Sequence, residues 1–386
     1  MARKCIAVLE IGSSKMTCIV GSRGASGIFE IAAQSQFEYA GFMEGEFLEP
    51  EALKGAISQV VTNAQTEACR YITHLYVGVP AEFSLVSVRS SGKSFTKPKK
   101  VTTFDVDELF EKLEAQENSA THVVVGSSPV CFELSDKRKV IDVVGEITTS
   151  FAATLSFVLA ERSFVSTISK ALDALDIPNI EFVSEPLAEC MFVVDTAKRD
   201  EGAILIDCGY ITTGVAIAMG DGLVALNSFS LGGGHLSGDL YKCLEIPFNV
   251  CENLKRKIVL NVQPEDDDYY QVVCDGETHK VNAKQANDIV LARLEQIAGI
   301  INQCIEASNI PFEENKTVLL TGGGISLVRG ARDRLSKYLG RRVEVVAPVV
   351  PELNKPNLSA AISLLNFALD QAPTVKLNIF KFFNKK

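Results

Sequence analysis

The stretch AILIDCGYITTGVAIA, residues 203–218, joins two apolar segments through a short polar turn. Its first half, which ends at Asp207, has the apolar and β-branched residues of a buried strand. Gly209 then permits a tight reversal of the chain. We therefore predict a β-hairpin that presents Asp207 and a threonine-containing turn.

The same pattern occurs near the N-terminus, in IAVLEIGSSKMTCIVG, residues 6–21. Here Glu10 stands in the place of Asp207, and Gly12, Ser13 and Ser14 form the turn. Two such modules, roughly 200 residues apart, indicate an internal repeat. We expect two similar lobes that face each other with a ligand between them.

Composition narrows the class of protein. A chain of 386 residues predicts two or three domains, and 47% hydrophobic with 22% charged residues is typical of globular proteins. The net charge of −10 argues against general nucleic-acid binding, which needs clustered Lys and Arg. Ten cysteines without a Cys-x-x-Cys pair indicate reduced thiols in a cytosolic protein, not a zinc site. We expect neither a signal peptide nor a membrane-spanning helix, since no apolar run approaches about 18 residues.

The pattern of expected strands and helices changes between residues 82 and 162, where we predict an inserted subdomain. Strands are expected at 83–89, 123–125 and 140–144. A helix is expected to begin at Asp105, with Glu108 completing a capping box. Beyond the central hairpin, a basic amphipathic helix is predicted at 249–260.

Two further glycine-rich turns follow the central hairpin. Residues 232–234 precede a predicted helix, where free backbone N–H groups favour an anion, and residues 322–324 follow an apolar strand. The position three after Gly324 is Leu327, and no Gly-Lys-Ser or Gly-Lys-Thr occurs, so Rossmann dehydrogenases and P-loop NTPases are disfavoured.

The ordered set of loops resembles the actin-like ATPase superfamily and, within it, the bacterial FtsA cell-division family. The resemblance covers nearly the whole chain and implies an α/β fold of two RNase H-like lobes, an inserted FtsA-type subdomain and a C-terminal amphipathic helix. It divides the chain into lobe 1 (1–81, 163–200 and 357–370), the inserted subdomain (82–162), the lobe 2 core (201–230 and 311–356), a lobe 2 subdomain (231–310), and a linker with a membrane-targeting helix (371–386).

The resemblance also implies ATP and Mg²⁺ as cofactors. Glu10 and Asp207 would hold Mg²⁺ through water, and Glu185 with Pro186 matches the Glu-Pro before a lobe-connecting helix. The positions that match nucleotide-binding residues are Gly12, Ser13, Ser14, Lys15, Asp207, Gly209, Thr212, Thr213, Gly232, Gly233, Asp239, Glu252, Lys255, Gly322, Gly323 and Gly324.

Four positions depart from the family pattern. Glu10 replaces the usual Asp, and the longer side chain disturbs the strict geometry of Mg²⁺. Tyr210 and Ile211 replace a Gly-Gly pair, which adds bulk beside the expected phosphates, and Gly214 stands where relatives often have a second acid. We therefore expect nucleotide binding with slow or absent hydrolysis.

The C-terminal sequence VKLNIFKFFNKK is basic and apolar, although the protein is acidic. At about 100° per residue its apolar side chains gather on one helical face, as in helices that lie on anionic membranes. The alternative is a terminal helix that docks on the protein itself. The predicted membrane-binding residues are Leu377, Ile379, Phe380, Lys381, Phe382, Phe383 and Lys385.

These features lead to one functional hypothesis and three alternatives. The resemblance implies a polymer-forming tether that binds the C-terminal tail of FtsZ, meets other division proteins through its inserted subdomain, and lies peripherally on the inner face of the cell membrane at the division site. The nearest alternative is a PilM-like component of a pilus or secretion assembly. A sugar or acid kinase and an Hsp70-like chaperone are the others, and the chaperone is disfavoured because the chain ends without a substrate-binding domain.

Overall fold

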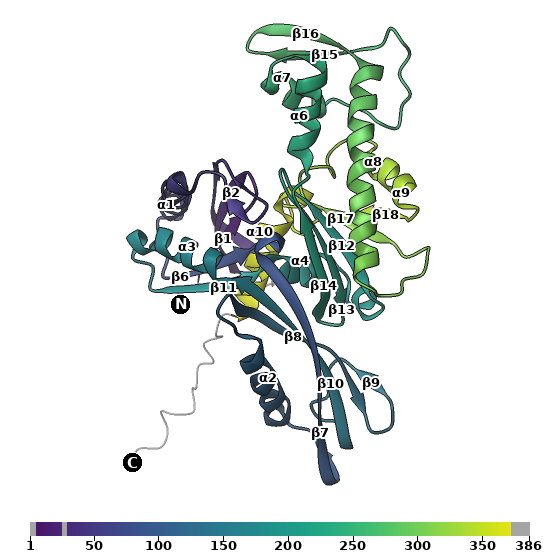
Figure 1. The fold of residues 1–386 in the computed structure, drawn as a ribbon. Helices are drawn as coiled ribbons and strands as arrows, with labels where there is room; N and C mark the ends of the chain where they lie inside the picture. The colour runs from purple at the N-terminus through teal and green to yellow at the C-terminus, as the bar shows by residue number, and fades with distance from the viewer. Residues whose placement is uncertain (1–4, 25–28, 372–386) are drawn as a thin grey trace.

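The computed structural model describes residues 5–24 and 29–371. The molecule contains two lobes, each built on a five-stranded sheet, and an inserted subdomain below them (Figure 1). The two predicted hairpins are present: β1 pairs antiparallel with β2 and β12 with β13, and each pair is the start of one lobe.

Lobe 1 has the strand order β11-β6-β1-β2-β3. Along β1, Ala7, Leu9 and Ile11 pack with α1 and α3, whereas Ile6 and Val8 face α10. This alternation follows the two-residue period of a strand and explains why β1 is apolar on both faces. The elements are β1 (Ile6–Ile11), β2 (Lys15–Arg23), β3 (Phe29–Glu38), β4 (Phe42–Met43), β5 (Glu46–Phe47), α1 (Pro50–Glu67), β6 (His74–Val79), α3 (Arg162–Leu172), η2 (Asp173–Leu175), β11 (Asn179–Ser184), η3 (Pro356–Leu358) and α10 (Ser359–Gln371).

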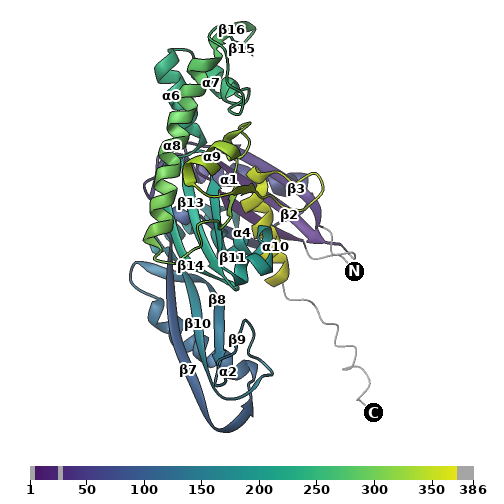
Figure 2. The ribbon, with the colours of Figure 1, turned by 90° about the vertical axis from the view of Figure 1, so that its right-hand side faces the viewer.

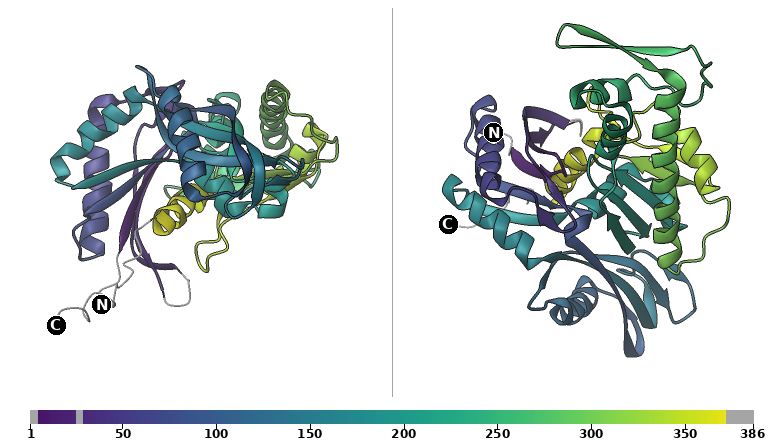
Figure 3. Two further views of the ribbon diagram at one scale, coloured as in Figure 1. Left: turned by 90° about the horizontal axis from the view of Figure 1, so that it is seen from below. Right: turned by 45° about the horizontal axis from the view of Figure 1, so that its top comes forward.

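Lobe 2 has the strand order β14-β13-β12-β17-β18. Along β12, Ile204 and Ile206 pack in the core with α8 and α9, and Ala203 and Leu205 pack with α4. The helices α4 and α10 pack against each other. The yellow helix between the two sheets in Figure 3 is α10. The elements are α4 (Glu185–Val193), α5 (Thr196–Asp200), β12 (Ala203–Cys208), β13 (Thr213–Met219), β14 (Gly222–Phe229), β17 (Val318–Thr321), α9 (Ala331–Leu339) and β18 (Val343–Val345).

A smaller subdomain extends from lobe 2 at the end opposite the inserted subdomain, and α8 connects it to the lobe 2 sheet (Figure 2). It contains α6 (Gly233–Leu244), α7 (Phe248–Lys255), β15 (Tyr269–Cys274), β16 (Glu277–Asn282) and the start of α8 (Ala283–Ala307). The predicted helix over 249–260 is wrong at its C-terminal end. The helix stops at Lys255, and Ile258 and Leu260 instead pack into the lobe 2 core.

The inserted subdomain is a sheet of order β7-β10-β8-β9 with α2 packed on it. The hydroxyl of Ser156 in β10 donates a hydrogen bond to the carbonyl of Leu223 in β14, so the sheet contacts lobe 2. The strand expected at 140–144 is wrong, since the strand there ends at Val140. The elements are η1 (Ala81–Phe83), β7 (Ser84–Lys100), α2 (Thr103–Glu117), β8 (His122–Leu134), β9 (Lys139–Val140) and β10 (Ile147–Glu161).

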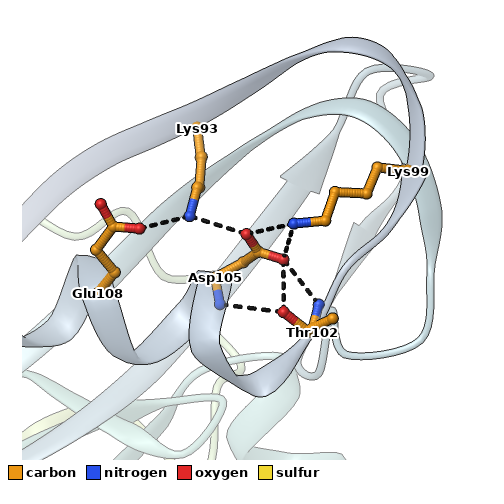
Figure 4. Close-up of polar contacts among 5 residues, drawn as sticks. All are labelled: Lys93, Lys99, Thr102, Asp105 and Glu108. Atoms are coloured by element: carbon orange, nitrogen blue, oxygen red, sulfur yellow. Dashed lines mark hydrogen bonds and ion pairs between the residues drawn. The ribbon is translucent and has the colours of Figure 1, made fainter.

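The capping box of α2 lies one turn earlier than expected. Thr102 is the N-cap residue and Asp105 is the third helical residue, and each side chain bonds the backbone N–H of the other. Glu108 instead forms an ion pair with Lys93, as Figure 4 shows. The prediction therefore failed because Asp105 has the reciprocal role in a Thr-x-x-Asp box.

Candidate functional site

The turns of the two hairpins meet between the lobes. The Ser13 hydroxyl oxygen accepts hydrogen bonds from the backbone N–H groups of Ile211, at 3.0 Å, and Thr212, at 3.4 Å. Each turn is closed by its own backbone bond, from Gly12 N–H to the Lys15 carbonyl and from Gly209 N–H to the Thr212 carbonyl. The internal repeat therefore places two equivalent turns against each other.

A third loop, Gly322–Gly324, packs behind the turn of lobe 2. The Gly324 N–H donates to the Cys208 carbonyl at 2.8 Å. Gly322 has φ +82°, and a Cβ there would lie 2.2 Å from the Asp207 carboxylate. Only glycine fits, because a side chain would be strained in this conformation and would collide with Asp207.

The lobes are also joined along one side of the site. The Ser230 hydroxyl accepts the Glu44 N–H at 2.9 Å and donates to a Glu82 carboxylate oxygen at 3.2 Å. The Gly45 N–H donates to the same Glu82 oxygen. Hydrogen bonds thus tie the β4–β5 hairpin of lobe 1 to lobe 2.

A cavity of about 800 Å³ lies among these loops, within the size range of small-molecule sites. The structure brings most of the predicted site residues to its lining: Glu10, Gly12, Ser13, Ser14, Lys15, Asp207, Gly209, Thr212, Glu252, Lys255, Gly322, Gly323 and Gly324.

Four predicted residues, Thr213, Gly232, Gly233 and Asp239, do not line the cavity. Thr213 is buried and donates to the Leu231 carbonyl. The Gly232 N–H donates to His235 Nδ1, and the Gly233 N–H donates to the Gly209 carbonyl. Asp239 forms a two-pronged ion pair with Arg293, at 2.6 and 2.7 Å.

Buried carboxyl groups gather at the base of the cavity. Burial raises the pKa of Glu10 to about 7 and that of Asp207 to about 6. Burial, followed by nearby carboxylates, raises the pKa values of Glu185 and Glu189 well above their ordinary range. Glu189 is absent from the sequence predictions, although its position one turn after Glu185 on α4 is a usable signal.

Glu10 and Asp207 supply the oxygen ligands that Mg²⁺ prefers. Among the residues with described positions, no group of three or more His, Cys, Asp or Glu is placed to hold a metal directly. The two carboxyl groups could hold a hydrated ion through water, and its charge would lower the raised pKa values of both.

The opposite end of the cavity carries a hydrogen-bonded network from α7 and the turn of lobe 2. The Tyr210 hydroxyl donates to Glu252 Oε1 at 2.8 Å, and Lys255 Nζ lies 3.0 Å from the same oxygen. Burial alone would raise the pKa of Glu252, but the nearby Ser237 hydroxyl, the Lys255 charge and the hydrogen bonds from Lys255 and Tyr210 lower it overall. Glu252 is therefore an ionised acceptor that faces a ligand space.

The residues partly fit a nucleoside phosphate. Glu252 and Lys255 supply polar groups that a nucleoside could meet, beside the glycines of the third loop. The Ile211 and Thr212 N–H groups, which could otherwise donate to a phosphate oxygen, donate to the Ser13 hydroxyl.

A family profile described as "Cell division protein FtsA" matches residues 204–363. The cell division protein FtsA of Neisseria meningitidis serogroup B is 24% identical over 372 residues, which cover 94% of this chain and 90% of that protein. The chain is related to the cell division protein FtsA. The similarity to FtsA therefore extends through both lobes and the inserted subdomain.

Solved structures agree on the fold of this FtsA relative. The PilM-PilN type IV pilus biogenesis complex gives a TM-score of 0.64 at 18% identity and covers 95% of this chain and 99% of that one. MreB 5 of Spiroplasma citri bound to AMPPNP gives 0.55 at 11% identity and covers 95% and 96%. The fold is that of the actin-like ATPases, as predicted.

The predicted membrane-binding residues, Leu377, Ile379, Phe380, Lys381, Phe382, Phe383 and Lys385, lie outside the described residues. In the part of the chain with assigned positions, no helix is long and apolar enough to cross a membrane.

Proposed function

We propose that this chain is an actin-like, nucleotide-binding cell-division protein that polymerises and tethers FtsZ filaments to the cytoplasmic membrane at the division site. The observation that carries the proposal is similarity to FtsA over 94% of the chain. The cleft between the lobes and the inserted subdomain support it, since both are retained in the structure.

The cavity is proposed to take ATP with Mg²⁺. Glu10 and Asp207 would hold the ion through water, and the ion would neutralise the phosphates and polarise them. Glu252 and Lys255 would face the nucleoside. Hydrolysis is expected to be slow or absent, because Tyr210 and Ile211 add bulk and Ser13 occupies two phosphate-facing N–H groups. Nucleotide then acts as a conformational ligand between the lobes.

Charges at opposite ends of the molecule support self-assembly. The far end of β7 carries exposed Lys97 and Lys100, whereas exposed Glu265, Asp267 and Asp268 precede β15. The far end of β7 and the β15–β16 hairpin lie at opposite ends of the molecule (Figures 1 and 2). Opposite charges on opposite ends favour head-to-tail contact between copies. Other division proteins are proposed to meet the inserted subdomain.

The tail after α10 is proposed to bind the inner, anionic membrane surface as an amphipathic helix. One helix of about three turns binds weakly, but several tails on one polymer bind firmly through avidity. The matched test is Phe380→Glu against Asn378→Glu, which adds the same charge to the opposite face. Only Phe380→Glu is expected to abolish sedimentation with anionic liposomes.

Binding of an FtsZ C-terminal peptide to the full chain tests the partner assignment. Fluorescence anisotropy is expected to give saturable binding, with a scrambled peptide as the control. An absent interaction would contradict the division assignment and favour the PilM-like alternative, which predicts no membrane helix.

A further inference from the structure

The Tyr210 side chain lies in the part of the cavity where Glu252 and Lys255 are proposed to face the nucleoside. It lines the cavity, and its hydroxyl donates to Glu252 Oε1 at 2.8 Å. Lys255 Nζ lies 5.2 Å from the centre of the Tyr210 ring, and its charge favours that position over an aromatic face. The three side chains thus form a closed network.

The Tyr210 ring also lies on the first turn of α6. A Cβ at Gly234 would be 2.7 Å from a Tyr210 ring carbon, so the ring packs directly against the helix backbone. The Gly234 N–H donates to the Tyr210 carbonyl at 2.7 Å, and the Gly233 N–H to the Gly209 carbonyl. The N–H groups that begin α6 are therefore taken by the turn that carries Tyr210, and are not free for an anion.

Glu252 has a single class of suitable partner besides Lys255. An ionised carboxylate accepts hydrogen bonds and donates none. A ligand group that replaces the phenol hydroxyl must therefore be another donor. Adenosine offers two kinds, the sugar hydroxyls and the adenine amino group, and its dideoxy form lacks only the sugar hydroxyls.

We propose that Tyr210 is a built-in competitor that sets the ligand selectivity of this cavity, because its hydroxyl occupies the Glu252 carboxylate that a ligand's sugar hydroxyl would take. This inference rests on the proposed nucleotide function. Sugar hydroxyls should therefore add little to the affinity of the wild-type site, because a hydrogen bond from a sugar hydroxyl to Glu252 replaces the bond from Tyr210.

The test measures the binding affinities of Mg-ATP and Mg-2′,3′-dideoxy-ATP for the full chain by calorimetry. Tyr210→Phe keeps the ring and removes only the competing hydroxyl, and Tyr71→Phe, at an exposed tyrosine of lobe 1, is the matched control. Wild type and Tyr71→Phe are expected to bind the two ligands within about twofold of each other. Tyr210→Phe is expected to bind ATP about tenfold more tightly, as for one hydrogen bond to a charged group, with no change for the dideoxy ligand.

Each outcome separates this inference from the nucleotide proposal. If wild type binds ATP and Tyr210→Phe binds it no more tightly, the role of Tyr210 is overturned and the nucleotide site stands. If only Tyr210→Phe binds ATP, the competition is supported and the wild-type site is not a nucleotide site. If neither binds, both ideas fail. An equal gain for both ligands contradicts competition for the sugar hydroxyls and indicates either a steric effect or a bond from the adenine amino group.

Discussion

Asp105 is the residue by which α2 is fastened to β7, and its replacement gives the most quantitative prediction. Its side chain is 2% exposed, and its carboxylate pairs with Lys93 at 2.8 Å and Lys99 at 2.7 Å. It also accepts the Thr102 N–H and hydroxyl, at 3.0 and 2.7 Å (Figure 4). The side chain therefore combines an ion-pair cluster with a helix cap.

Asp105→Asn keeps one acceptor oxygen for Thr102 but replaces the charge that faces both lysines. Two charge-assisted hydrogen bonds are lost, each contributing about 1.5 kcal/mol at the lower end of the usual range. The lower end applies because Lys93 and Lys99 are 24% and 45% exposed and can turn towards water. We expect a loss of about 3 kcal/mol in the local free energy of opening, which is a factor of about 150.

Native-state hydrogen exchange of the α2 amides measures this opening directly, and avoids treating a multidomain chain as two-state. Glu108→Gln is the control, because Glu108 is 58% exposed and its ion pair with Lys93 contributes less than about 1 kcal/mol. A change below about threefold in Asp105→Asn would refute the reasoning.

The pH dependence of the same cluster has a defined sign. Hydrogen bonds from Lys93, Lys99 and Thr102 hold the pKa of Asp105 well below its usual range. The stabilisation is therefore complete above the unfolded pKa of about 3.9 and is lost as the pH falls through the lower folded pKa. Protection of α2, corrected for intrinsic exchange, should be constant from pH 8 to about 5.

Two further predictions concern the site. Gly322→Ala should lower the melting temperature and abolish Mg-ATP binding, because the added Cβ would collide with Asp207. Gly276→Ala is the control, since Gly276 has a similar φ of +83° but open space around it. An equal effect of both substitutions would point to backbone strain alone. Burial raises the pKa values of Glu10 and Asp207 to about 7 and 6, so Mg²⁺-free protein should lose stability as the pH rises from the unfolded values near 4 through the folded values. Thermal melts at pH 5 and 8 should show this loss, and Asp207→Asn should reduce it; a flat profile would contradict protonation of the buried pair.

Local patterns identified the two hairpins and the glycine loop, because strand periodicity and glycine requirements are properties of short segments. Contacts between segments that are distant in the sequence are harder to predict from the sequence. That Glu189 joins Glu10 and Asp207 at the cavity base depends on how α4 packs between the lobes. That Asp239 pairs with Arg293 depends on the packing of α6 on α8.

Some errors were local. The sequence contains two possible capping boxes, Thr102 with Asp105 and Asp105 with Glu108. The structure uses the first, and α2 then buries Leu109 and Leu113. The role of Tyr210 was hidden for another reason. Its bulk was visible in the sequence, whereas its hydrogen bond to Glu252 spans 42 residues.

Reconstitution on liposomes tests the central claim, that this chain links FtsZ to a membrane. Labelled FtsZ filaments, anionic vesicles and the full chain are mixed and sedimented, beside a chain that ends at residue 371. The account predicts that FtsZ sediments with vesicles only when the full chain is present. Equal recovery of FtsZ with the shortened chain, or none with either, would contradict it.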